Sequence, residues 1–275
     1  MSVPVEAQHY TVQATPAAQE AGAVALAVAS LPESFGPATG ENPPHVQVIA
    51  GQPGWTVEAA KAVTAGARGI VVVNPAAENT DSLQAAAQQS GTAVVLDQRW
   101  ASNPAIEGAE DAVRSMAGRS ALLDTVATAP VGADSGELLA DHLAVVVRVA
   151  GPLGNLRVLA RGPRGYTATA VLANGAPVAL QGIVTSARPA GVHVAVLTDD
   201  GGVSVTLPEP LAAWPATVRV TGPQGELLLP TIYESAHRAT WRRLKEHLDA
   251  GTIPSDLHSF AVLSDSITAL TQTHR

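Results

Sequence analysis

The chain has 275 residues, a formal net charge of −8 and no cysteine. This length is enough for one large domain or two of ordinary size. The negative charge and the lack of a basic cluster argue against nucleic acid and anionic membranes as partners. Without cysteine the chain has no disulfides, no thiol nucleophile and no Cys-ligated zinc.

Hydrophobic residues make up 46% of the chain and aromatic residues 3%, so small aliphatic side chains are expected to fill the core. No basic segment followed by an apolar core opens the sequence, and no apolar run is long enough to span a bilayer. We therefore expect a cytoplasmic protein. The histidines lack metal-ligand spacing, which predicts no metal site.

The first 45 residues contain two candidate strands, His9–Thr15 and Val24–Ser30, followed by a loop rich in Pro and Gly at Phe35–Pro44. A dinucleotide-binding unit carries Gly-x-Gly-x-x-Gly between such strands, at the start of a helix. Only PAAQEAGA stands there, which is too short for that helix. We predict a shortened unit, with Ser30 in place of the acid that binds the ribose hydroxyls.

Strands and helices alternate at short spacing between Val46 and Ile106. Val46–Ala50, Ile70–Val73 and Thr92–Leu96 are short apolar runs of the kind that form buried parallel strands. Ala-rich segments between them favour helices. The pattern predicts parallel βαβ units with right-handed crossovers.

The pattern becomes antiparallel from Asn155 onward, after a strand candidate at Ala121–Thr128 and a helix candidate within Gly136–Gly151. Turns such as Asn174-Gly175 separate the later strand candidates. Two helices are predicted at the end of the chain. The predicted strands are Asn155–Arg161, Tyr166–Ala173, Ala176–Ser186, Val192–Leu197, Val203–Leu207, Thr217–Thr221 and Glu226–Leu229.

Several segments in order resemble motifs of the glucose–fructose oxidoreductase and inositol dehydrogenase family (Gfo/Idh/MocA). They are VIAGQPG, IVVVNP and DQRWASNPAI in the first half, then GELLADHLAVVVRVAG and GPQGELLLP. The resemblance covers roughly residues 24–270. It implies a degenerate, N-terminally shortened member, with a truncated Rossmann-like α/β domain at 1–125 and an α+β antiparallel-sheet domain flanked by helices at 126–275.

The resemblance also locates candidate site residues. Family members carry Glu-Lys-Pro after the strand that here ends in Val73-Asn74-Pro75, so Asn74 takes the place of the catalytic lysine. Asn has no titratable proton for acid–base work. The family's catalytic helix corresponds to the segment with Asp141 and His142 adjacent, read either as a base or as ordinary structural residues. The candidate cofactor-binding residues are Gly51, Gln52, Pro53, Asn74 and Pro75.

These departures predict that the dinucleotide site is lost and that no cofactor binds. The chain is then a non-catalytic or regulatory subunit, or a protein that binds a small polyol or sugar. The alternative is an NAD(P)-dependent oxidoreductase acting on a sugar or cyclitol, with NAD or NADP held unusually. A third reading is a cofactor-independent lyase or isomerase with Asp97, Asp141 or His142 as base. Small apolar strand residues favour a homo-oligomer, or a hetero-oligomer with a related subunit.

Overall fold

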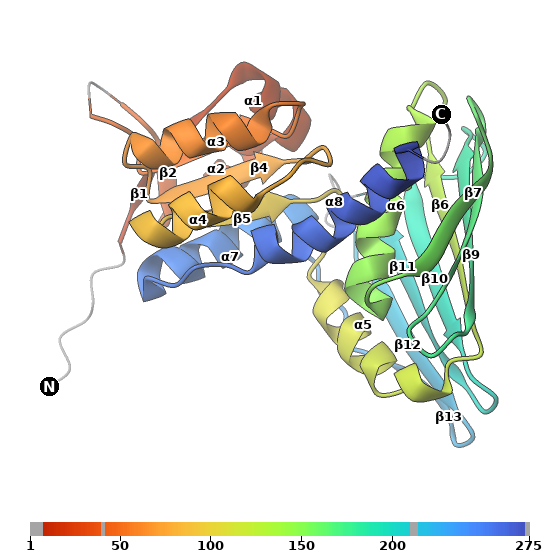
Figure 1. The fold of residues 1–275 in the computed structure, drawn as a ribbon. Coiled ribbons are helices and arrows are strands. Elements are labelled where there is room, and N and C mark those ends of the chain that lie inside the picture. Colours follow the sequence, from red (N-terminus) through yellow and green to blue (C-terminus); the bar gives the residue numbers. More distant parts are fainter. Residues whose placement is uncertain (1–7, 40–41, 210–213, 273–275) are drawn as a thin grey trace, which may run out of the picture. The chain divides into compact units, whose positions relative to one another are not determined.

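The computed structural model describes residues 8–39, 42–209 and 214–272. By its contacts the chain divides into two compact units, each built around a sheet of its own (Figure 1). The first unit comprises Met1–Gln98 and His237–Ala261, and the second comprises Arg99–Ala236 and Val262–Arg275. The division into domains at 1–125 and 126–275 stays a prediction. By contacts, the first unit also includes the later segment His237–Ala261.

The first unit contains a five-stranded parallel sheet in the order β2-β1-β3-β4-β5. Because all strands run the same way, their carboxyl ends form one edge, and ligands of such sheets bind along that edge. The elements are β1 (Tyr10–Ala14), α1 (Pro16–Gly22), α2 (Val24–Ala29), β2 (Phe35–Pro37), β3 (Val46–Ala50), α3 (Trp55–Thr64), β4 (Gly69–Val73), α4 (Asp81–Ser90), β5 (Ala93–Asp97) and α7 (Ala236–Ala250).

The beginning of the chain differs from the sequence prediction. The segment predicted as a second strand, Val24–Ser30, forms helix α2, and the true second strand β2 lies inside the predicted loop. The alternating valines and alanines fit both patterns, but Val24, Ala27 and Val28 are the buried residues, which is the spacing of one helical face. A complete, though short, βαβ unit therefore opens the chain.

The second unit contains an eight-stranded sheet in the order β13-β12-β11-β10-β6-β9-β8-β7. All neighbours are antiparallel except β6 and β9. The predicted fold class, a Rossmann-like sheet followed by an antiparallel sheet with helices, is confirmed. Its elements are α5 (Ala105–Arg114), a 3₁₀ turn (Ala117–Arg119), β6 (Leu122–Ala129), α6 (Ser135–Ala150), β7 (Gly154–Gly162), β8 (Gly165–Val171), β9 (Pro177–Val184), β10 (Gly191–Leu197), β11 (Gly202–Pro208), β12 (Thr217–Gly222) and β13 (Gly225–Leu228).

The end of the chain completes the core of the first unit. Trp241 of α7 is 1% exposed, and its ring packs edge-on against Phe35 of β2 with centroids 5.0 Å apart. Phe35 in turn contacts Tyr10 of β1. The last helix, α8 (Asp256–Gln272), begins in the first unit and ends in the second. None of the helices in the described ranges combines the length and hydrophobicity needed to cross a bilayer.

Replacement of Trp241 by Ala tests this closure of the first core. We expect Trp241→Ala to lower the free energy of unfolding by about 3–5 kcal/mol, because the substitution removes a large buried side chain and leaves a cavity. Urea unfolding followed by circular dichroism measures the loss. Trp214, which is 62% exposed, is the matched control. A loss for Trp241→Ala no larger than that for Trp214→Ala would contradict this packing.

Candidate functional site

The carboxyl ends of β3 and β4 bring the predicted cofactor-binding residues together. The Gly51 N–H donates to Val73 O over 2.7 Å, and the Ala76 N–H donates to Gly51 O over 2.6 Å. A Cβ on Gly51 would lie 2.5 Å from the Pro75 nitrogen, so the close approach of the two strand ends requires glycine. Asn74 has φ +50, a conformation that asparagine tolerates better than most residues.

The loop after Gly51 leads into α3 and exposes Gln52 and Pro53. Gly54, with φ +94, is the residue before the helix, which begins at Trp55. The Glu78 carboxylate accepts the Gly54 N–H and the Thr56 hydroxyl, the latter over 2.8 Å. Glu78 thereby satisfies donors that helix starts otherwise offer to anions.

The turn from β1 into α1 does not fit the glycine-rich cradle of a dinucleotide diphosphate. Thr15 caps α1, and its hydroxyl accepts the Ala18 N–H over 3.2 Å. Pro16, the first helical residue, has no N–H to offer. Ser30 ends α2, where its hydroxyl donates to Ala27 O. Ser30 therefore ends a helix and does not follow the second strand, where the sequence prediction placed it.

A buried carboxylate closes the same edge at β5. Asp97 is 1% exposed, and its Oδ2 lies 2.5 Å from Nδ1 of His237. The Thr240 hydroxyl donates to the other carboxylate oxygen over 3.2 Å. Both partners come from α7. His237 is 6% exposed, so this basic residue of the helix faces the core and not the solvent.

In the second unit His142 lies inside the core, fully buried between α6, β6 and β8. Its Nε2 lies 2.6 Å from the Thr125 hydroxyl, and its Nδ1 lies 2.6 Å from the Tyr166 hydroxyl. Because Thr125 donates to His193 O, it accepts from Nε2 of His142, and Nδ1 then accepts from Tyr166. Burial lowers the pKa of His142 to about 3, so the ring is neutral.

Asp141 points away from that network although it is the neighbouring residue. Its carboxylate lies 4.0 Å from the Arg99 guanidinium, and Arg99 also pairs with Glu209 over 2.9 Å. Burial raises the pKa of Asp141 to about 7, against the lowering effect of Arg99. The Arg99 guanidinium also lies over the ring of Trp100, at 4.5 Å from its centroid. Asp141 is thus an acid–base group that titrates near neutral pH.

The structure gathers some sequence candidates and separates others. Gly51, Gln52, Pro53, Asn74 and Pro75 share one edge of the first unit, whereas Asp141 and His142 face different surroundings in the second. Sequence reasoning missed Arg99 and Glu209. Arg99 stands inside the quoted motif DQRW, which was a usable signal, but nothing in the sequence connects it with Glu209.

No protein-family model matches the chain, and no curated protein matches it either. Solved structures do. KijD10, a 3-ketoreductase from Actinomadura kijaniata crystallised with NADP, superposes with a TM-score of 0.70 at 12% identity, over 96% of this chain and 97% of that one. Levoglucosan dehydrogenase, crystallised with NADH and L-sorbose, gives 0.70 at 13% identity, over 97% of each chain.

A third match is the UDP-N-acetylglucosamine 3-dehydrogenase GnnA from Acidithiobacillus ferrooxidans, with a TM-score of 0.67 at 14% identity, over 96% of this chain and 97% of that one. The chain has the fold of these oxidoreductases. All three are of the Gfo/Idh/MocA type, so the resemblance drawn from the sequence motifs is confirmed in the fold.

The prediction that no cofactor binds is contradicted by these comparisons. Proteins with the same fold over nearly the whole chain hold NADP or NADH in their crystals. The missing glycines do not prevent the first βαβ unit from forming, because β1, α1, α2 and β2 build it without them.

The opposite pKa shifts of Asp141 and His142 make opposite contributions to the pH dependence of stability. His142 binds its proton more weakly when folded, so between about pH 3 and 6.5 it makes stability rise with pH. Asp141 binds its proton more tightly when folded, so between pH 3.8 and about 7 it makes stability fall as pH rises. Each slope reaches about 1.4 kcal/mol per pH unit.

Substitutions of Asp141 and of His142 should therefore change the slope of stability against pH in opposite directions. Between pH 4.5 and 6, Asp141→Asn should make stability rise more steeply with pH than in the parent, and His142→Gln should make it rise less steeply or fall. Urea unfolding at a series of pH values measures both slopes. Slopes that shift in the same direction in the two variants would refute the assigned environments.

Proposed function

We propose that this protein is an NAD(P)-dependent oxidoreductase of the Gfo/Idh/MocA type that acts on a sugar or cyclitol. One observation carries the proposal: the chain shares its fold from end to end with oxidoreductases crystallised with NADP or NADH. The substrates named for two of these proteins are sugars or sugar derivatives, UDP-N-acetylglucosamine and levoglucosan. A cytoplasmic location stays a prediction from the sequence.

The cofactor site of the proposed enzyme is the carboxyl edge of the first sheet. The cofactor would be bound there without a glycine-rich loop. Gln52 and Asn74 are exposed there and offer amide donors and acceptors. The rigid junction of Gly51 with Pro75 fixes the position of Asn74. Binding would rest on these groups and on apolar contact, because Thr15 and Glu78 occupy the helix starts that usually bind phosphate.

Oxidation of an alcohol to a carbonyl requires a group that accepts the hydroxyl proton, while a bound nicotinamide supplies the hydride acceptor. We assign proton transfer to Asp141. It is 24% exposed by its side chain, and its pKa of about 7 suits transfer in both directions at neutral pH. His142 is less suited, since both ring nitrogens are hydrogen-bonded in the core. Arg99 and Glu209 stand beside Asp141 and could bind substrate hydroxyls.

Titration of the full chain with NADH and NADPH tests the cofactor directly. We expect saturable heat with at least one of them, with a Kd between about 1 µM and 1 mM. Asn74→Ala should weaken binding, and Asn79→Ala, an exposed asparagine in the following loop, serves as the control. Absence of binding at millimolar concentrations of both cofactors would reject the proposal.

Substitution of Asp141 tests the assigned proton acceptor. In assays with free and nucleotide-linked sugars and cyclitols, Asp141→Asn should lower kcat by about 100-fold at neutral pH, because the amide cannot accept the proton. In the parent, the rate of alcohol oxidation should rise with pH around 7 as Asp141 ionises. Glu107→Gln, at an exposed acid on α5, is the control. Activity of Asp141→Asn within twofold of the parent would assign the proton to another group.

We further propose that the second unit mediates a homo-oligomer, or a hetero-oligomer with a related subunit. On one face of its sheet, strands β9 and β10 expose apolar residues such as Ile183 and Leu197, at 37% and 44%. Their neighbours Ala179 and Ala195 are only half-buried. Exposed apolar side chains on a sheet face are suited to subunit contacts.

A further inference from the structure

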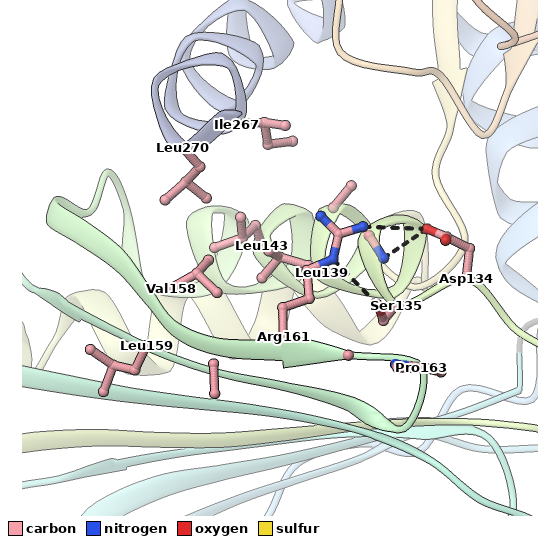
Figure 2. A pocket seen from close by; sticks show the side chains of 14 residues that line it. Asp134, Ser135, Leu139, Leu143, Val158, Leu159, Arg161, Pro163, Ile267 and Leu270 are labelled. Atoms are coloured by element: carbon pink, nitrogen blue, oxygen red, sulfur yellow. Dashed lines mark hydrogen bonds and ion pairs between the residues drawn. The ribbon is translucent and has the colours of Figure 1, made fainter. Parts of the chain in front are cut away.

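A cavity of about 940 Å³ lies in the second unit, and neither Asp141 nor any described residue of the first unit lines it. Helix α6, the edge strand β7 and α8 line it (Figure 2). Its volume falls in the range of small-molecule sites. We propose that this cavity binds an aliphatic carboxylate, with the chain among the leucines and the carboxylate at Arg161.

The body of the cavity is aliphatic. Leu139 and Leu143 of α6 form one wall, Val158 of β7 faces them, and Ile267 and Leu270 of α8 close the side (Figure 2). No aromatic ring lines it among the described residues, so it lacks the stacking platform that a sugar ring would use. An alkyl chain matches this lining, because each methylene group that moves from water into the cavity makes binding more favourable.

The polar end of the cavity is built around one cation. Nε of Arg161 donates to the Ser135 hydroxyl over 3.3 Å, and its Nη2 lies 3.8 Å from Asp134. Asp134 also accepts the N–H groups of Gly136 and Glu137, so its carboxylate is fixed in place. Within the described part of the chain, no hydrogen bond uses Nη1 of Arg161. A carboxylate is the natural acceptor for a guanidinium edge of this kind.

Two backbone features place Arg161 at this end. In β7 the register with β8 shifts between Val158 and Ala160, which adds a residue to the strand. Val158 and Arg161 are three residues apart and would face opposite sides of a regular strand, yet both point toward α6 (Figure 2). On the helix, a Cβ at Gly136 would lie 2.9 Å from Cζ of Arg161, so glycine makes room for the guanidinium.

Calorimetric titration of the full chain with octanoate and with 1-octanol tests the proposal. Octanoate should bind at one site with a Kd below about 1 mM, and octanol about tenfold more weakly, since it lacks the charge that Arg161 would bind. Arg161→Gln should weaken octanoate about tenfold and leave octanol unchanged. Arg219→Gln is the matched control, because both arginines lie on strands of the same sheet and are 47% exposed by their side chains.

A second pair of variants tests the aliphatic wall. Val158→Thr keeps the shape of the side chain, and it should weaken octanoate and octanol alike, by about fourfold. Val126→Thr, also half-buried on a strand of this sheet, should change neither. Circular dichroism checks the folding of each variant. If Arg161→Gln does not fold, Arg161→Lys replaces it. Its octanoate affinity should be about threefold lower than that of the parent, because the lysine ammonium lacks the planar set of donors that binds a carboxylate with two hydrogen bonds.

Three results would overturn the proposal. They are the absence of saturable octanoate binding, equal effects of the Arg161 and Arg219 substitutions, and octanol binding as tightly as octanoate. Light scattering on the same samples supplies a fourth. If Val158→Thr alone lowers the molecular mass in solution, the cavity is covered by a second copy of the chain. Titration with NADH and NADPH in parallel reports on the cofactor binding of the proposed oxidoreductase separately, so the two proposals can fail independently.

Discussion

The Asp97 carboxylate is the point at which distant parts of the first unit are held together. It sits at the end of β5, almost without exposure to water, and both of its oxygens are engaged by side chains of α7. A buried carboxylate without partners would be strongly destabilising, so the last helices must return to this sheet. Their return also brings Trp241 against Phe35 and seals the core under β1 and β2. The carboxyl edge of the sheet depends on this closure.

The two units offer different chemistry. The first provides a rigid edge with amide side chains and helix starts that are already occupied by Thr15 and Glu78. The second provides a carboxyl group whose proton exchanges near neutral pH, beside a cation that pairs with another acid. Adjacent residues there have opposite roles: His142 is fixed and neutral in the core, whereas the half-buried Asp141 remains titratable. Burial of the imidazole, rather than its intrinsic basicity, decides between them.

Much of the fold could be predicted from the sequence, because short apolar runs bounded by Gly and Pro identify β3, β4 and β5, and turn residues separate the later strands. The region before Val46 could not, since alternating valine and alanine fit a strand and a helix equally well and only burial decides. Among the site residues, Gly51, Asn74 and Pro75 come from neighbouring βα units, so their meeting was predictable. The partnership of Asp97 with His237 joins residues 140 positions apart, and no local pattern reveals it.

The contact between Asp97 and His237 also brings together two points at which the chain passes from one unit to the other. The longer segment of the second unit, Arg99–Ala236, begins two residues after Asp97 and ends one residue before His237. Its entry and exit points are therefore neighbours in space, as in an inserted cassette. Topologically, a short linker could bypass the insert while leaving the parallel sheet and α7 joined. The tail of α8, whose residues from Val262 onward belong to the second unit, would lose its packing partner.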